Sequence, residues 1–354
     1  MQHMLELLRN KTGLVVTVHI PKGMNSVDAT RALTDNVVLL CEQVADPQRI
    51  CLSVDGAECG VDVAVELATR FGVRQIAAET PLGKLQGARL GVDHLLEDES
   101  LEHVICVDQD GDHFANELLN LVRAAECIRA QADTDRIIVL GQRSSMHRPM
   151  GLLRGELEEL ADRILLDALT YHAALTGTPL RMEHAFTFGE YPDFHSGYKL
   201  FSRPIAEAVF RSEPNLAGTP PVCYYRHAVE AVMVVEALEA GAYLGVVNRS
   251  TYNEQPISAF GMMAREQLMA NTIIWPCKRL AIPVHFVRQW LDNHLPRLLL
   301  DTLRPDGGSE LQAVRRLVLD AFGEGDAPPV TDASLVCVAV PNGGAAGRPN
   351  QECP

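Results

Sequence analysis

The chain has 354 residues, 47% of them hydrophobic and 22% charged, which is typical of a globular protein with a sizeable core. Its formal net charge of −15, with no basic stripe, argues against nucleic acid as a partner. The cysteines lack metal-knuckle spacing, which favours reduced thiols and a cytoplasmic protein. No apolar run reaches the roughly 18 residues of a membrane span, and Met1–Lys11 lacks a signal-peptide core.

Strands alternate with helices through residue 140. Apolar runs predict strands at Gly13–Ile20, Arg49–Val54, Val73–Ala77, His103–Val107 and Arg136–Leu140. Segments with helical periodicity lie between them, at Val27–Gln43, Val61–Phe71, Leu82–Leu96 and Phe114–Gln131. This alternation is typical of βαβ units and predicts an α/β fold with a mostly parallel central sheet flanked by helices. Ligands bind such sheets beyond the carboxyl ends of the strands.

The second half is less regular and more helical. Helices are expected at Leu152–Tyr171, Tyr224–Ala240, Gly261–Ile274 and Val284–Asp301. Strands are expected at the end of Asp193–Phe201 and over Tyr243–Val247. We therefore predict an N-terminal helix or tail over 1–12, a sheet domain over 13–250, a helical C-terminal extension over 251–322 and a flexible tail over 323–354.

Three aspartates directly follow the strand at His103–Val107. Asp108, Asp110 and Asp112 are spaced by two, so alternate side chains of an extended strand end would converge on one spot. A hard divalent cation, Mg²⁺ or Mn²⁺, suits such oxygen-only ligands. The alternative interpretation is an acidic, solvated turn.

Several separated motifs resemble GT-A glycosyltransferases of the family-2 type. They lie within Gly13–Asn25, Leu52–Asp55, Gly83–Leu95 (GKLQGARLGVDHL), Val107–Asp112 (VDQDGD), Gly141–Arg143, Ser196–Phe201 (SGYKLF) and Val229–Gly241 (VEAVMVVEALEAG). The last helix is also similar to that of glucosyl-3-phosphoglycerate synthases. The resemblance implies a GT-A, Rossmann-like fold, with a nucleotide-sugar-binding half over 13–140 and an acceptor-binding half over 141–250.

The chain departs from the family pattern at several positions. Gly56 follows Asp55 where a second acid is usual, Leu90 stands where asparagine is common, and Ala231 follows Glu230. No Q-x-x-R-W sequence appears, which argues against a processive polysaccharide synthase. The region Asn248–Gln255 contains no histidine that could serve as a late metal ligand, so metal dependence is left open.

The resemblance implies transfer of a sugar from a UDP- or GDP-sugar to a soluble acceptor. Charge builds on the departing diphosphate, and Mg²⁺ or Mn²⁺ at Asp108 and Asp110 would neutralise it. His227 is a further candidate ligand, whereas Asp112 is expected to cap the loop. The implied donor contacts are His19, Pro21, Asp55, Lys84, Arg89, Asp108 and Arg143.

An inverting transfer needs a general base within reach of the acceptor hydroxyl. Glu230 is the candidate, and His195 and Asp193 are expected near the acceptor. Glu230 has an alternative role as a first-turn carboxylate that favours its helix. For His195 and His227, the alternative to a catalytic or metal-binding role is a purely structural one. The C-terminal helices are a candidate homodimer contact.

Three other functions compete with this interpretation. The reduced acidic pairs fit a catalytically degenerate GT-A-like module for binding or oligomerisation. The V-D-Q-D-G-D sequence also fits a haloacid-dehalogenase-like phosphatase with Asp108 as nucleophile, although Asp112 replaces the usual threonine. A nucleotidyltransferase fits poorly, because the loop after the first strand, P-K-G-M-N, has one glycine and one lysine.

Overall fold

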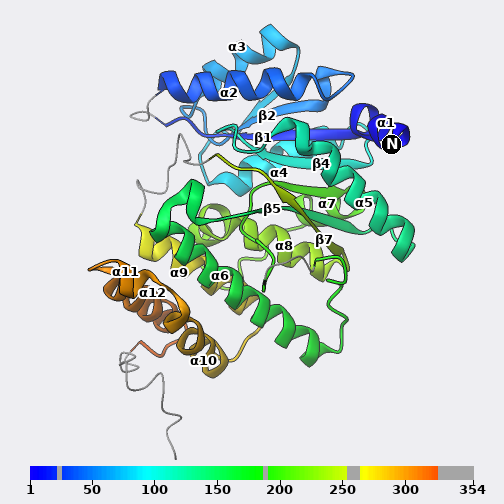
Figure 1. Cartoon of the computed structure of the whole chain (residues 1–354). Helices are drawn as coiled ribbons and strands as arrows, with labels where there is room; N and C mark the ends of the chain where they lie inside the picture. The colour runs from blue at the N-terminus through cyan, green and yellow to red at the C-terminus, as the bar shows by residue number, and fades with distance from the viewer. Residues whose placement is uncertain (22–25, 186–189, 253–263, 326–354) are drawn as a thin grey trace, which may run out of the picture.

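The computed structural model describes residues 1–21, 26–185, 190–252 and 264–325. Its centre is a seven-stranded sheet in the order β3-β2-β1-β4-β6-β5-β7 (Figure 1). The strands are β1 (Thr12–Val18), β2 (Ile50–Val54), β3 (Arg74–Ala77), β4 (His103–Asp108), β5 (Ile137–Arg143), β6 (Lys199–Ser202) and β7 (Tyr243–Arg249). Only β6 of these strands runs antiparallel to its neighbours, β4 and β5. The predicted α/β fold, with a mostly parallel sheet and a helical C-terminal region, is confirmed.

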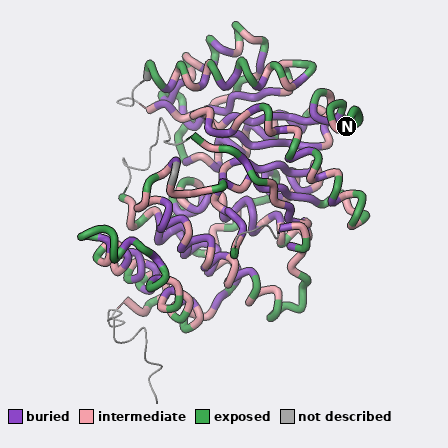
Figure 2. The backbone as a smooth tube through the Cα atoms, viewed as in Figure 1, coloured by how far each residue is buried: buried purple, intermediate pink, exposed green. Residues whose placement is uncertain are grey.

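Both faces of the sheet are buried, which explains the nearly continuous apolar strands. Residues such as Val16 and Ile105 face the helices α1 (Gln2–Lys11), α2 (Ser26–Cys41), α3 (Val61–Phe71) and α5 (Leu118–Ala132). Residues such as Val15 and Val104 face α4 (Lys84–Leu95), α6 (His147–Thr176), α7 (Arg203–Phe210), α8 (Val229–Glu239) and α9 (Arg265–Arg279). Figure 2 shows the buried strands between these two helical layers.

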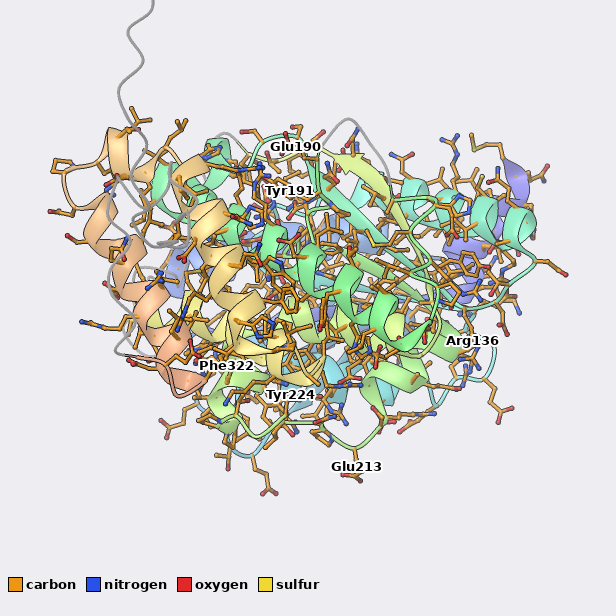
Figure 3. The ribbon with its side chains drawn as sticks, turned by 90° about the horizontal axis from the view of Figure 1, so that it is seen from below. Arg136, Glu190, Tyr191, Glu213, Tyr224 and Phe322 are labelled. Atoms are coloured by element: carbon orange, nitrogen blue, oxygen red, sulfur yellow. The ribbon has the colours of Figure 1, made fainter. Side chains whose placement is uncertain are left out.

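The C-terminal helices share the second of these cores. Trp275 of α9 is fully buried, its indole nitrogen donates to the Asn215 carbonyl at 3.0 Å, and its ring meets Tyr224 edge-on at 5.7 Å. Tyr224 lies beside α9 in Figure 3. Helices α10 (Val284–His294), α11 (Leu300–Leu303) and α12 (Gly307–Ala321) pack beyond α6 and α9 (Figure 1).

The predicted helix Tyr224–Ala240 is interrupted near its start. Residues Cys223–His227 form a π-turn, closed by a hydrogen bond from the Ala228 amide to the Cys223 carbonyl at 2.8 Å. Helix α8 begins only at Val229. π-Turns often accompany functional sites, because the extra residue redirects the side chains beside it.

Two other predicted helices are shorter than expected. The segment Phe114–Gln131 opens with a 3-10 turn over Ala115–Glu117. The segment Val284–Asp301 breaks around Pro296, which has no amide hydrogen to donate within a helix. Of the other predictions, the loop at 22–25, the start of Gly261–Ile274 and the tail from residue 326 lie outside the described residues.

The helices and the cysteines can be compared directly with the expectations from composition. Among the described helices, none has both the length and the apolar character needed to cross a bilayer. The described cysteines, Cys41, Cys51, Cys59, Cys106, Cys127, Cys223 and Cys277, are all free thiols.

Helix α4 lies unusually close to β1 and β2. A Cβ atom at Gly91 would lie 2.6 Å from Val15 Cγ1 and 2.9 Å from Ser53 Cβ, so only glycine fits without movement. One turn earlier, Ser53 Oγ donates to the Gly87 carbonyl at 2.6 Å. This close packing brings the N-terminus of α4 to the carboxyl ends of both strands.

We expect Gly91→Ala to lower the free energy of unfolding by about 1–2 kcal/mol, because overpacking a core outweighs the gain in helix propensity. Gly87→Ala on the same helix is the control. Its Cβ would meet the nearest atom at 3.6 Å, an ordinary contact. Urea unfolding measures both variants, and equal stability of the two would contradict the close packing.

Candidate active site

A cavity of about 360 Å³ opens beyond the carboxyl ends of β1, β2 and β4. This is within the size range of small-molecule sites. It gathers residues that are far apart in sequence, among them His19, Asp55, Lys84, Asp108, Asp110, Arg143, His195, Arg226, His227, Glu230 and Arg249. Most of the site residues predicted from the sequence therefore line one cavity.

Lys84 joins two carboxylates inside this cavity. Its ammonium lies 2.8 Å from Asp108 Oδ1 at the end of β4 and 2.7 Å from Glu230 Oε1 in the first turn of α8. Burial alone would lower the pKa of Lys84, but the two carboxylates outweigh it and raise the pKa. Burial alone would raise the pKa of Asp108 and Glu230, but Lys84 outweighs it and holds the pKa of both below the usual range. Glu230 is therefore a weak proton acceptor.

Asp55 and Gly83 position Lys84 at the start of α4. Asp55 Oδ1 accepts hydrogen bonds from the Leu82 and Gly83 amides, each at 3.1 Å. Gly83 has a φ of 142° and packs so closely that a Cβ would lie 2.2 Å from the Tyr225 carbonyl oxygen. The second Asp55 oxygen lies 3.9 Å from His19 Nδ1. One oxygen of Asp55 thus holds the turn, and the other faces His19 at the predicted donor site.

The middle residue of the D-x-D element joins two strand ends. Gln109 Oε1 accepts from the His19 amide at 2.8 Å, and Gln109 Nε2 donates to the His19 carbonyl at 2.9 Å. Asn36 of α2 donates to the Asp108 carbonyl at 3.0 Å. These bonds fix His19 and Asp108 relative to one another. Neither Gln109 nor Asn36 was predicted from the sequence.

The other two aspartates of the element differ. Asp110 lines the cavity, and its Oδ1 accepts from the Asp112 amide at 3.1 Å. Asp112 is buried, pairs with Arg249 at 3.0 Å and accepts from the Tyr252 amide at 2.8 Å. Asp112 therefore ties the loop to the end of β7, as the predicted loop-capping role requires.

Asp108 and Asp110 both line the cavity and offer the carboxylate oxygens that Mg²⁺ or Mn²⁺ binds. Within the described chain, no third histidine, cysteine or carboxylate side chain converges with them; the one such cluster is His147, Glu156 and Glu159 on α6. Mg²⁺ commonly binds one or two carboxylates and completes its shell with phosphates and water. A cation held by this pair would therefore need phosphate oxygens or water to complete its shell.

His227, the further candidate ligand, lies in the π-turn and lines the cavity, but its ring does not converge with Asp108 and Asp110 as the predicted ligand set requires. Its Nδ1 meets the Asn271 side-chain nitrogen at 2.8 Å, which fixes the ring. Burial lowers the pKa of His227, so the neutral imidazole is favoured.

Arg143 and Asp193 are engaged with each other. Arg143 Nε lies 2.7 Å from Asp193 Oδ2, one terminal nitrogen lies 2.5 Å from Oδ1, and the Arg143 amide donates to Oδ2 at 3.0 Å. Glu158 accepts from the same guanidinium at 2.8 Å. Burial would raise the pKa of Asp193, but Arg143 brings it to about 2. Asp193 does not line the cavity, so its predicted acceptor-side role becomes support for Arg143.

The structure does not bring Arg89 to the cavity. Its guanidinium donates to the Val209 and Ser212 carbonyls at the end of α7, at 3.2 and 2.5 Å. Five residues of helix separate Arg89 from Lys84, which rotates it by about 140° around the axis of α4. Its predicted diphosphate contact is therefore corrected to a bond with α7. Pro21 follows β1 but is not a lining residue either.

The S-G-Y-K segment presses β6 against the D-x-D element. Ser196 Oγ donates to the Gly141 carbonyl at 2.6 Å. A Cβ at Gly197 would lie 2.6 Å from Asp108 Oδ2, so a larger residue would displace this carboxylate. His113, which the sequence analysis did not select, accepts from the Asp108 amide at 2.9 Å and stacks on Tyr198.

Lys199 is the most unexpected residue near the site. It lies within β6, is 0% exposed, and donates to the Ser196 carbonyl. Burial lowers its pKa to about 8, although Glu230 acts in the opposite direction. A lysine inside an apolar strand sequence is the signal that could have identified it.

Known proteins offer little comparison. No protein-family model and no curated protein sequence matches the chain. Among solved structures, the crystal structure of S. aureus TarS residues 1–349 is similar at 12% identity and a TM-score of 0.40, covering 89% of this chain and 92% of that chain. So low a score carries no weight for function.

Lys199 gives a prediction about pH. Its pKa in the folded protein is about 8, below the usual value near 10.5. Below about pH 8 the lysine is charged in both the folded and the unfolded protein, and burying this charge lowers the free energy of unfolding. We expect Lys199→Met to raise the free energy of unfolding at pH 7, by about 3 kcal/mol. The gain shrinks as pH rises from about 8 and vanishes above about 10.5.

Lys11→Met, at a lysine whose side chain is 41% exposed, is the control and should change stability little at any of these pH values. Denaturant unfolding at a series of pH values measures both. A Lys199→Met gain that persists above pH 10.5 would show that the lysine is not the titrating group.

Proposed function

We propose that the protein is a glycosyltransferase that moves a sugar from a nucleotide-diphosphate sugar to a soluble acceptor. One observation carries the proposal: Asp55, Lys84, Asp108 and Glu230, each from a separate family-like motif, line one cavity. The cavity lies where parallel strands end, the usual position of nucleotide sites in α/β sheets. An accidental resemblance of four short motifs would not require their side chains to meet.

The nucleoside would occupy the end of the cavity formed by His19 and Asp55. Asp55 Oδ2 would accept an N–H group of the base, while Oδ1 keeps its bonds to the turn before α4. His19 Nδ1 is buried and has no hydrogen-bond partner among the described residues. That leaves it available to a ligand, which supports a polar contact to the nucleoside.

The diphosphate would lie near Lys84 and Arg226. Arg226 is exposed, lines the cavity, and has no acidic partner within the described chain. Two cations beside the leaving group stabilise the charge that develops on it. Mg²⁺ or Mn²⁺ held by Asp108 and Asp110 would supply further neutralisation as a Lewis acid. Glu230 holds Lys84 in place through the 2.7 Å ion pair.

Binding of UDP-glucose and GDP-mannose, with and without Mn²⁺, tests the proposal by titration calorimetry. We expect one nucleotide sugar to bind, and Lys84→Met to weaken it roughly 10- to 100-fold, because a charge-assisted hydrogen bond is lost. Arg89→Gln is the matched control. It removes a positive charge from the same helix but outside the cavity, and should leave the dissociation constant unchanged.

The outcomes separate the competing functions. If neither nucleotide sugar binds, the glycosyltransferase proposal is wrong. Binding without transfer or slow donor hydrolysis would indicate a catalytically degenerate binding module. Hydrolysis of a generic aryl phosphate that disappears in Asp108→Asn would indicate the phosphatase instead.

A further inference from the structure

His195 has a fixed partner on one side and none on the other. It lies just before β6, lines the cavity, and its Nδ1 is 2.6 Å from Asp162 Oδ1. The His195 amide donates to the same oxygen at 3.2 Å. Because Asp162 accepts both bonds, Nδ1 carries the hydrogen, and Nε2 of the neutral ring is a proton acceptor. Asp162 lies within α6 and is 0% exposed.

The Nε2 atom of His195 is buried and has no hydrogen-bond partner among the described residues. The side chain as a whole is only 6% exposed. A buried polar atom without a partner costs about 1–3 kcal/mol, and such atoms often serve binding or catalysis. A ligand hydroxyl in the cavity would satisfy it.

The segment that carries His195 is tied to α6 at its start. Arg163 pairs with Glu190 at 2.7 Å, and its guanidinium lies over the Tyr191 ring, 4.6 Å from the centroid. Figure 3 shows Glu190 and Tyr191 together at one edge of the molecule. Helix α6 thus holds this segment at Arg163 and at Asp162. Such support limits the positions open to the imidazole.

Glu230, the base expected from the sequence, is less suited to this task. Lys84 holds its carboxylate at 2.7 Å, and the pair lies beside Asp108. A carboxylate neutralised by an ammonium accepts a proton less readily than an imidazole oriented by an aspartate.

We propose that His195 accepts the proton of the acceptor hydroxyl through Nε2, with Asp162 as its positioning residue. This inference rests on the proposed glycosyl transfer. In the step, the acceptor O–H bond breaks and its proton moves to Nε2. The acceptor oxygen bonds to the anomeric carbon, and the bond from that carbon to the diphosphate breaks, its electron pair leaving with the nucleoside diphosphate. Asp162 stabilises the imidazolium that results, which later returns its proton to water.

Charged groups around His195 support this assignment. Burial would lower the pKa of His195, but the Asp162 carboxylate outweighs it and raises the pKa. The titratable groups near the pair are Glu158 on α6, Arg143 on β5, Asp193 and Tyr191 on the loop, and Glu230 on α8. The acids among them favour the imidazolium, and Arg143 opposes it. Activity should therefore fall on the acidic side as His195 becomes protonated.

The test compares His195→Gln and Asp162→Asn with the wild-type protein, using the nucleotide sugar that binds. We expect His195→Gln to lower kcat about 100- to 10,000-fold without changing the donor dissociation constant. We expect Asp162→Asn to lower kcat and to move the acidic limb of the pH–rate profile by about one unit toward lower pH.

His294→Gln is the matched control. His294 Nε2 lies 2.6 Å from Asp167 on the same helix α6, and its Nδ1 is likewise buried without a partner among the described residues, but it does not line the cavity. This variant loses an equivalent ion pair and should keep its kcat and pH profile. A loss of kcat equal to that of His195→Gln would show that both act only through stability.

A spectroscopic measurement needs no substrate. In protein labelled with ¹⁵N-histidine, wild-type His195 should show a protonated Nδ1 and an unprotonated Nε2 above its pKa, and Asp162→Asn should lower that pKa. A proton on Nε2, or kcat retained in His195→Gln, would overturn the inference. A wild-type protein without any transfer would sink the proposed function first, and this inference with it.

Discussion

The ammonium of Lys84 between the carboxylates of Asp108 and Glu230 is the interaction on which the cavity depends. It joins Asp108, at the end of the central strand β4, to Glu230, at the start of α8. Glu230 lies 146 positions after Lys84 in the chain. Without the cation, two partly buried carboxylates would face each other, and repulsion would favour opening the site. In the proposed function, the same ammonium would also contact the diphosphate of the donor.

Backbone fit makes that interaction possible. Gly91 lets α4 approach the sheet, Gly83 lets its N-terminus pass against the π-turn, and Gly197 lets β6 approach Asp108. The antiparallel β6 matters for the same reason: it is inserted between parallel strands and delivers the His195 segment to the edge where those strands end. The chemistry of the cavity therefore depends on glycines, at positions where any larger residue would clash with a neighbour.

The fold and half of the site were predictable from the sequence, for identifiable reasons. The apolar strand patterns end at Asp55 and Asp108, and these patterns can be recognised from local sequence alone. Because ligands bind beyond the carboxyl ends of parallel strands, both residues could be assigned to the site. Partnerships between distant segments were not predictable: nothing near Asp193 shows that Arg143 takes its carboxylate, or near His195 that Asp162 lies beside it. Arg89 was misplaced because the motif fixes its position in sequence but not its direction around the helix.

We propose that a nucleoside diphosphate binds at the carboxyl ends of β1, β2 and β4. A crystal structure of the protein with a nucleoside diphosphate and Mn²⁺, with the metal located by anomalous scattering, tests it most directly. We expect the base beside His19 and Asp55, the diphosphate beside Lys84, and manganese at Asp108 and Asp110. A nucleotide elsewhere, or manganese only at the His147, Glu156 and Glu159 cluster, would contradict it.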